Sequence, residues 1–197
     1  MGSLRILFIA GALAAVYVAA IALAATSDNI SGWAWSGNIG WISFNDANSG
    51  SGGGSYGVNA DGSGNLSGYA WSPNIGWVSF NSPHTVNCPS EPGNPSCAPQ
   101  INFTTREVSG FARVCAGTVA GDCTGAGRTD GWEGWISLRG SNPNSSYGVS
   151  VAGSNPYLWN GWAWGGEVLG WLSFSGSGTG GGGAGGGGGG GGGYGVV

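Results

Sequence analysis

Residues 67–81 decide the fold, because their sequence, SGYAWSPNIGWVSFN, recurs with small changes along the chain. Residues 31–45 read SGWAWSGNIGWISFN, and residues 161–174 read GWAWGGEVLGWLSF, with one extra residue in the connection. A diverged copy is split between SGFARV at 109–114 and GWEGWISL at 131–138. Self-similarity of this kind is typical of a fold assembled from repeated units, here four of them. The Gly-Trp dipeptides of the copies are spaced by 36, 58 and 36 residues and contain Trp41, Trp77, Trp135 and Trp171.

Each copy alternates with a period of two, which is typical of β-strands. Tyr69 and Trp71 would share one face of a strand, and Gly68 and Ala70 the other. The SPNIG and SGNIG segments between the two halves have the residues of hairpin connections. The YGV segments before copies two and four suggest a third strand in those units. The sequence therefore predicts one all-β domain over residues 26–175, made of repeated antiparallel hairpins or three-stranded meanders. A sandwich, a barrel and a small propeller-like ring all remain open, and no helix is expected outside the N-terminal segment.

Tryptophans at equivalent positions of several copies are expected to form the core, because Trp buries a large area on folding. Small residues on the opposite strand face, such as Ala34 and Ala70, would let a neighbouring sheet approach closely. Trp132 and Trp159 lie away from the repeated motif and are the candidates for exposed residues that stack on a ligand. The expected repeat core consists of Trp33, Trp35, Trp41, Trp71, Trp77, Trp135, Trp162, Trp164 and Trp171.

Residues 1–25 form a separate segment, in which Arg5 precedes an apolar run over residues 6–25 that ends in small residues. This pattern indicates a cleaved export signal, with an uncleaved membrane anchor as the alternative. Four cysteines outside any CxxC motif agree with export and predict two disulfides. The favoured pairs are Cys88–Cys97 and Cys115–Cys123, because each pair flanks a short turn-rich stretch. Zinc binding by the cysteines is the alternative. The expected location is extracellular or at the cell surface.

The C-terminal residues repeat part of a unit. Residues 176–193 are almost entirely Gly and form a flexible tail, and residues 194–197 read YGVV, a third-strand motif with no unit after it. Unit one, in contrast, has no YGV segment before it. Three arrangements follow: the tail closes the ring by pairing with unit one, it donates a strand to another molecule, or the reading frame stops within a repeat.

Composition argues against nucleic-acid binding and against catalysis. The 197 residues include 45 Gly and 11 Trp, but five Arg and no Lys, and the net charge is −4. Such a chain does not bind nucleic acid by neutralising its backbone. Catalysis has little support, because His84 is the single imidazole and a serine nucleophile needs a base.

The remaining ionisable groups are interpreted as ordinary surface residues. The carboxylates Asp130, Glu133 and Glu167 lie in or beside turns, and Arg106, Arg113, Arg128 and Arg139 are expected to form local ion pairs with Glu107, Asp122 and Asp130. Calcium at residues 46–55 or 59–65 is an alternative to simple hairpin turns, but neither segment has the terminal Glu of a calcium loop. No catalytic residue, cofactor or metal ligand is therefore assigned.

Over residues 29–174 the motifs GYAWSPNIGWVSF, GWISL and GWAWGGEVLGWLSF resemble a group of uncharacterised exported Trp-rich repeat proteins of candidate phyla radiation bacteria. The resemblance implies a bacterial envelope or extracellular setting, with no reaction and no functional residue to carry over. The expected function is a non-catalytic secreted or cell-surface structural or adhesion module. The alternatives are a carbohydrate-binding module that uses exposed Trp and Tyr, and a subunit of a self-assembling surface filament. The partner would be an envelope or extracellular protein or glycan.

Overall fold

The computed structural model describes residues 29–30, 32–46, 56–142, 144–153 and 158–174. The export signal or anchor, the Gly-rich tail, the YGVV segment and most of the 46–55 segment lie outside the described residues. Among the described residues, no helix has the length and apolar character needed to cross a membrane.

The described chain is nearly all β, as the sequence predicts. The strands are β1 (Trp33–Ser36), β2 (Gly40–Ser43), β3 (Val58–Ala60), β4 (Leu66–Ser72), β5 (Gly76–Ser79), β6 (Gln100–Asn102), β7 (Glu107–Ser109), β8 (Phe111–Val114), β9 (Trp135–Ser137), β10 (Arg139–Asn142), β11 (Ser145–Ala152), β12 (Leu158–Trp164) and β13 (Trp171–Phe174). Two 3-10 turns, η2 (Ser82–His84) and η3 (Cys115–Gly117), and one short helix, α1 (Gly166–Leu169), accompany them. The expectation of no helix is wrong at α1, where the longer connection of the fourth copy closes a single helical turn.

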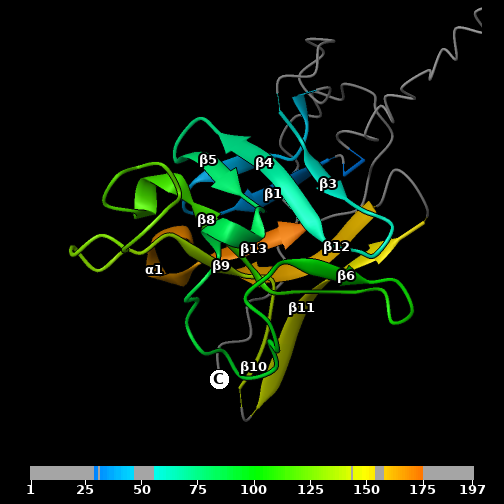
Figure 1. Cartoon of the computed structure of the whole chain (residues 1–197). Helices are drawn as coiled ribbons and strands as arrows, with labels where there is room; N and C mark the ends of the chain where they lie inside the picture. The colour runs from blue at the N-terminus through cyan, green and yellow to red at the C-terminus, as the bar shows by residue number, and fades with distance from the viewer. Residues whose placement is uncertain (1–28, 31, 47–55, 143, 154–157, 175–197) are drawn as a thin grey trace, which may run out of the picture.

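Each repeat contributes one hairpin to a closed antiparallel barrel of eight strands. The hairpins are β1–β2 in unit one, β4–β5 in unit two, β8–β9 in unit three and β12–β13 in unit four. The strand order is β13-β1-β2-β4-β5-β8-β9-β12, and pairing of β12 with β13 closes it. Figure 1 shows these strands gathered around one centre, with the β10–β11 hairpin projecting away from them. Of the three architectures left open by the sequence, the structure has the barrel.

Small and aliphatic residues fill the barrel. The first strand of each hairpin turns one fully buried alanine inward, and these are Ala34, Ala70, Ala112 and Ala163. The second strand turns inward Ile42, Val78, Ile136 and Leu172, followed by Phe44, Phe80, Leu138 and Phe174. An eight-stranded barrel encloses just enough space for side chains of this size. The small residues thus face the barrel interior, and the expectation that they make room for a second sheet is wrong.

The tryptophans of the predicted core point outward, which corrects that prediction. Side chains alternate along a strand, so residues flanking an inward alanine must face out. The most exposed are Trp33 (41%), Trp35 (44%), Trp41 (51%), Trp77 (42%), Trp162 (48%) and Trp171 (48%). Trp71, Trp135 and Trp164 are partly buried. None of the nine fits the interior, which Ile, Val, Leu and Phe already occupy.

Trp159 and Trp132, the predicted exposed pair, are also corrected. Trp159 is 5% exposed and contacts Phe44 and Phe174, each with ring centroids 5.5 Å apart. Trp132 is partly buried against the same core. Trp159 does occupy a repeated position, two residues before the glycine of its copy. The residues at that position, Ile30, Leu66, Val108 and Trp159, are all buried.

The first strand of units two and four continues past the barrel into an outer layer. There β3 pairs with the beginning of β4, and β11 pairs with the beginning of β12, which confirms the third strand predicted from the YGV segments. In unit three, β6 and β7 make the equivalent pair. The bend lies at a glycine with positive φ, Gly68 at 89° and Gly161 at 98°. A Cβ at either would collide with the carbonyl oxygen of a neighbouring strand, so these positions require glycine.

Candidate functional site

The outward tryptophans form a repeated cross-strand pair in three of the units. Trp35 lies opposite Trp41, Trp71 opposite Trp77, and Trp164 opposite Trp171. The ring centroids of the pairs are 4.8, 4.7 and 4.9 Å apart, and the planes are inclined by 57–62°. Tilted and edge-to-face contacts are favourable for aromatic rings, so each pair holds its two indoles in a fixed relation. Units four, one and two are neighbours around the barrel, so their pairs follow one another around its outer surface.

We call this surface the aromatic face. It consists of Trp33, Trp35, Trp41, Tyr69, Trp71, Trp77, Trp162, Trp164 and Trp171. Trp33 extends the pair of unit one, with its ring centroid 6.1 Å from that of Trp41. Tyr69 extends the pair of unit two, with its ring centroid 6.1 Å from that of Trp77. Large apolar side chains left in water on this scale are typical of a contact surface.

Serines lie between the units, next to the aromatic face, and of these Ser43 and Ser137 are buried whereas Ser173 is partly exposed. Ser173 is opposite Trp35, Ser43 is opposite Trp71, and Ser137 is opposite Trp164. The hydroxyls of two of them donate back to their own chain, Ser43 to the carbonyl oxygen of Asn45 at 2.9 Å and Ser137 to that of Arg139 at 2.6 Å. These groups stabilise the strand ends and are not presented to a ligand.

The hairpin turns of units one, two and four are linked by hydrogen bonds. The side-chain amide of Asn74 donates to the carbonyl oxygen of Ile39 at 2.9 Å, and that of Asn38 donates to the carbonyl oxygen of Val168 at 3.1 Å. The relative positions of the aromatic pairs are therefore fixed by contacts between the turns as well as by strand pairing.

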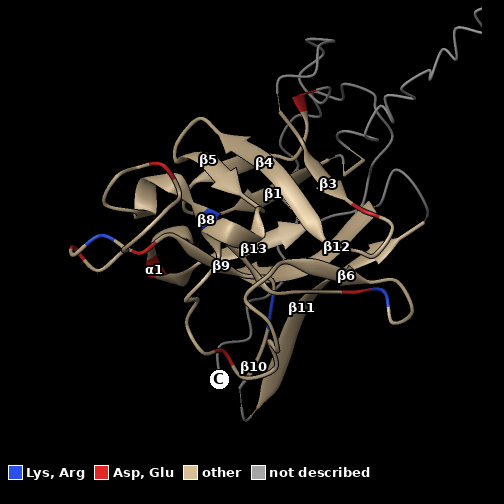
Figure 2. Cartoon of the chain, viewed as in Figure 1, with Lys and Arg blue, Asp and Glu red and all other residues tan. Residues whose placement is uncertain are grey.

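Charged residues are almost absent from the barrel strands that carry the aromatic face. Figure 2 shows β1, β4, β5, β12 and β13 in tan, with charged segments in loops and at the margins. Among the described arginines, Arg106, Arg113, Arg128 and Arg139 all belong to unit three or to segments next to it. The aromatic face is thus close to neutral.

Unit three departs from this pattern. Arg113 replaces the tryptophan found at the equivalent position of the other units, and its guanidinium lies 3.8 Å from the ring centroid of Trp135. Arg113 is 3% exposed, and its Nε and Nη2 have no hydrogen-bond partner among the described residues. Burial lowers the pKa of the guanidinium, and the Glu133 carboxylate partly offsets that effect. Glu133 itself accepts a hydrogen bond from Trp135 Nε1 at 3.1 Å.

The insertion between β8 and β9, residues 115–134, explains the burial of Arg113. The Cys115–Cys123 disulfide closes its first part, and η3 packs beside β5. The second disulfide joins Cys88 to Cys97, so both predicted pairings are confirmed and no described cysteine is left to bind zinc.

The segment closed by the second disulfide reaches the outer layer through Glu91. Glu91 accepts a hydrogen bond from the Tyr147 hydroxyl at 3.0 Å. Burial, together with Glu91, raises the pKa of Tyr147 to about 12. The Tyr147 ring also lies 5.0 Å from that of Trp171, so this contact supports one end of the aromatic face.

His84 has a serine partner that the sequence did not reveal. Its Nδ1 lies 2.8 Å from Ser79 Oγ, and Ser79 also accepts hydrogen bonds from the backbone and side-chain amides of Asn81. Ser79 is fully buried and is the repeat serine of unit two. A nucleophile must reach the reacting atom of its substrate, and this hydroxyl has no access to one. We interpret the contact as structural.

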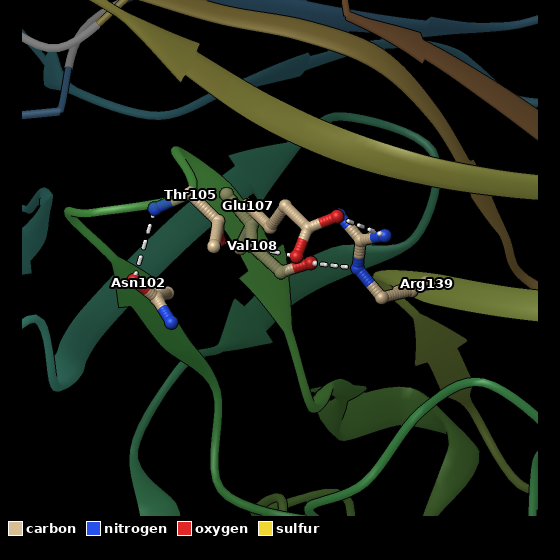
Figure 3. A network of polar contacts seen from close by, with 5 residues as sticks. All are labelled: Asn102, Thr105, Glu107, Val108 and Arg139. Atoms are coloured by element: carbon tan, nitrogen blue, oxygen red, sulfur yellow. Dashed lines mark hydrogen bonds and ion pairs between the residues drawn. The ribbon is translucent and has the colours of Figure 1, made fainter.

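Two of the carboxylates considered for catalysis, Asp130 and Glu133, have separate partners, Arg128 and Trp135 Nε1. Asp130 pairs with Arg128, which lowers the pKa of Asp130. Arg139 pairs with Glu107 at 3.0 Å and donates from Nε to the carbonyl oxygen of Val108 at 3.2 Å. Figure 3 shows this network extending through Thr105 to Asn102 in the β6–β7 turn. The predicted local ion pairs are therefore confirmed for Arg128 and Arg139.

The turn at residues 59–65 uses its carboxylate within the hairpin. Asp61 accepts hydrogen bonds from the side-chain amide of Asn65 at 2.9 Å and from the backbone amides of Asn65 at 2.9 Å and Ser63 at 2.8 Å, and these bonds, the first above all, lower its pKa. In the described part of the chain, no group of three or more His, Cys, Asp or Glu is placed to hold a metal ion.

Comparisons of the chain with protein-family models, with curated proteins and with solved structures gave no match. The aromatic face contains six of the nine large hydrophobic side chains that are exposed among the described residues, and it is the candidate functional site. Sequence reasoning missed it by assigning every repeated tryptophan to the core. The alanine between Trp33 and Trp35, repeated in each copy, was the available signal, since the small residue marks the inward face of a narrow barrel.

Proposed function

We propose that this protein is a non-catalytic extracellular adhesion module that binds neutral glycans through its aromatic face. The observation that carries the proposal is the exposure of six tryptophans on three adjacent units. Exposing indole rings to water is unfavourable in an isolated domain. A ligand that covers them would recover that free energy.

Glycans suit this surface because pyranose rings present flat C–H faces that pack on indole rings, while their hydroxyls remain hydrated at the edges. The face is nearly neutral and contains no Lys or Arg on its strands. It therefore gives no electrostatic attraction to nucleic acid or to strongly anionic polymers. A row of rigidly paired rings also favours an extended ligand over a single small molecule.

The extracellular setting is supported by the two disulfides, which are compatible with an oxidising compartment. The absence of catalysis is our inference from the engaged state of the candidate groups, above all the buried Ser79 and the ion-paired Asp130.

A glycan array followed by calorimetric titration with neutral oligosaccharides tests the proposal. Trp41→Ala should weaken binding by about tenfold or more, because a truncated aromatic anchor commonly loses 1–2 kcal/mol or more. Trp135→Ala is the matched control, since this ring occupies the equivalent position of unit three under Arg113. Equal binding by the parent chain and Trp41→Ala, or no binding to any neutral glycan, would reject the proposal.

A further inference from the structure

The outer layer follows one rule in every unit where its third strand is described. That strand lies between the beginning of its own unit and the preceding unit. In unit two, β3 pairs with β4 on one edge, and on the other edge Val58 pairs with Ile30 of unit one. In unit four, β11 pairs with β12 on one edge and with β7 of unit three on the other.

The hydrogen bonds of this arrangement repeat from unit to unit. The amide of Val58 donates to the carbonyl oxygen of Phe44 at 3.0 Å, and the amide of Val149 donates to that of Leu138 at 2.9 Å. In both cases the acceptor belongs to the last inward residue of the preceding hairpin. In the opposite direction, the amide of Ile30 donates to the carbonyl oxygen of Val58 at 3.1 Å.

One of these bonds, the one accepted by the third strand, recurs at the interface between units two and three. The amide of Leu66 donates to the carbonyl oxygen of Pro99 at 3.0 Å, as that of Ile30 does to Val58. Pro99 holds the Val58 position in unit three and opposes the bend glycine, Gly110.

Unit one has no such strand among the described residues. A Cβ at Gly68, Gly110 or Gly161 would collide with the strand that precedes it, whereas a Cβ at Gly32 meets no described atom within 4 Å. The gap lies between the beginning of unit one and the beginning of β12 in unit four. Its two edges carry Trp33, the equivalent of Tyr69, and Trp159, the equivalent of Ile30 and Leu66.

We propose that residues 194–197 of the same chain, Tyr-Gly-Val-Val, add the missing strand in this gap and complete the outer ring. These residues lie outside the described part of the chain, and the proposal rests on the described edges and on the repeat. By equivalence, Val196 would donate to the carbonyl oxygen of Phe174 and accept from the amide of Trp159. The carbonyl oxygen of Gly195 would accept from the amide of Trp33, as that of Gly57 accepts from Tyr69 at 2.9 Å.

Val196 and Gly195 are the residue types found at the equivalent positions of units two and four. Val58 and Val149, the equivalents of Val196, are fully buried. The carbonyl oxygens of Gly57 and Gly148 fill the space beside the bend glycines, and Gly195 would do so beside Gly32.

The repeat also predicts a ring contact for Tyr194 in unit one. Tyr56 lies 5.5 Å from Trp77 and Tyr147 lies 5.0 Å from Trp171. Tyr194 would take the same place against Trp41, the most exposed of the tryptophans at 51%.

The connection is long enough for closure within one molecule. Between the last inward residue of a hairpin and the next third strand, the chain has 11 residues (45–55), 16 residues (81–96) and 8 residues (139–146) in the three described cases. The Gly-rich connection from Phe174 to Tyr194 has 19 residues (175–193). Since 8 residues are enough after unit three, a connection of 19 residues is long enough for the strand to reach the same relative position.

Amide hydrogen exchange on the full chain tests the strand, with Trp33 and Trp159 as reporters. Val196→Asp would place a charge where Val58 and Val149 are buried, and should raise the exchange rates of both amides by about tenfold or more. Val197→Asp is the matched control, because the equivalent Asn59 and Ser150 are only partly buried. Identical exchange in the parent chain and in Val196→Asp would overturn the proposal.

A disulfide pair distinguishes closure within one molecule from strand donation. Ser150 lies opposite Glu107, so the equivalent pair Leu158→Cys and Val197→Cys should form an intramolecular disulfide on mild oxidation. The control pair Ser67→Cys and Val197→Cys has an exposed partner in unit two and should not crosslink. A crosslinked dimer whose yield rises with protein concentration would mean that a second copy supplies the strand, and would overturn closure within the chain.

Discussion

Unit three and units one, two and four share one barrel backbone but present opposite outer faces. At the position after the inward alanine, unit three has Arg113, 3% exposed, whereas unit one has Trp35, 44% exposed. The inward residues hardly differ, because each unit contributes a buried alanine and a buried aliphatic residue to the interior. The barrel therefore does not require tryptophan on its outer surface.

The insertion at residues 115–134 accounts for the difference. Unit three carries its own cover, which buries the outer position and pairs a cation with Trp135. Units one, two and four have no equivalent insertion in the described chain, and they keep their indoles in solvent. We infer that the open tryptophans are retained for contact with a partner and that unit three is the closed side of the molecule.

The strongest test of this comparison contrasts an inner with an outer tryptophan. Trp159→Ala should reduce the free energy of unfolding by about 3–5 kcal/mol, because it removes a large buried side chain from among Phe44, Phe80 and Phe174. Trp41→Ala should change it by no more than about 1 kcal/mol, because only edge contacts with Trp33 and Trp35 are lost. Urea unfolding followed by circular dichroism measures both. A larger loss for Trp41→Ala than for Trp159→Ala would reverse our assignment of inside and outside.

Removing the disulfide of the unit three insertion, residues 115–134, should have the next largest effect on stability. Cys115→Ser combined with Cys123→Ser releases a disulfide with a sequence separation of 8. The expected loss of stability is about 2–3 kcal/mol from the added freedom of the unfolded chain. Thermal unfolding measures the loss, and glycan binding by the aromatic face should be unchanged. Weaker glycan binding at a temperature where the variant is folded would show that the two faces are coupled.

The sequence predicted the strands because period-two alternation and turn residues act locally. The repeat also predicted four units, and the spacing of the cysteines predicted both disulfides. Closure into a barrel was not predictable in the same way, because it depends on the pairing of β13 with β1 across the whole chain. The inward direction of Ala34 follows from that closure, and so the tryptophans were assigned to the wrong side.

The contacts of the candidate site were still less accessible from sequence. Nothing local indicates that Arg113 would lie over Trp135 or that His84 would contact Ser79. Trp159 was missed for a simpler reason. Its equivalence to Ile30, Leu66 and Val108 appears only when the repeat is aligned from two residues before the bend glycine.

Raising the pH should reduce the free energy of unfolding, because it removes the contribution of the protonated Tyr147 hydroxyl in unit four. The pKa of Tyr147 is raised to about 12 from an ordinary value of 10.0, so the folded state favours the protonated hydroxyl. Stability is then fully present below pH 10 and is lost as the pH rises towards 12, by about 1–2 kcal/mol after allowance for solvent screening of this half-buried group. Tyr147→Phe should flatten that part of the pH profile, measured by rapid urea unfolding. Glu91→Gln should keep most of the slope, because burial is the larger cause of the shift. An unchanged slope in Tyr147→Phe would contradict this origin.

The smallest expected effect concerns the buried guanidinium itself. Arg113 has two nitrogens without hydrogen-bond partners, and Glu133 is not within ion-pair distance among the described contacts. Replacing this desolvated, incompletely hydrogen-bonded guanidinium while keeping its apolar length should therefore leave stability unchanged or raise it by about 1 kcal/mol. Arg113→Met makes this change and keeps a polarizable group over Trp135.

Arg139→Met is the matched control, because it breaks an ion pair with Glu107 and a hydrogen bond to Val108. It should lose about 1 kcal/mol. Equilibrium unfolding in urea, followed by Trp fluorescence, gives both values. A loss of more than about 2 kcal/mol in Arg113→Met would mean that the guanidinium has a partner in solution. The buried cation would then be a stabilising contact of unit three, in contrast to the neutral aromatic face of the other three units.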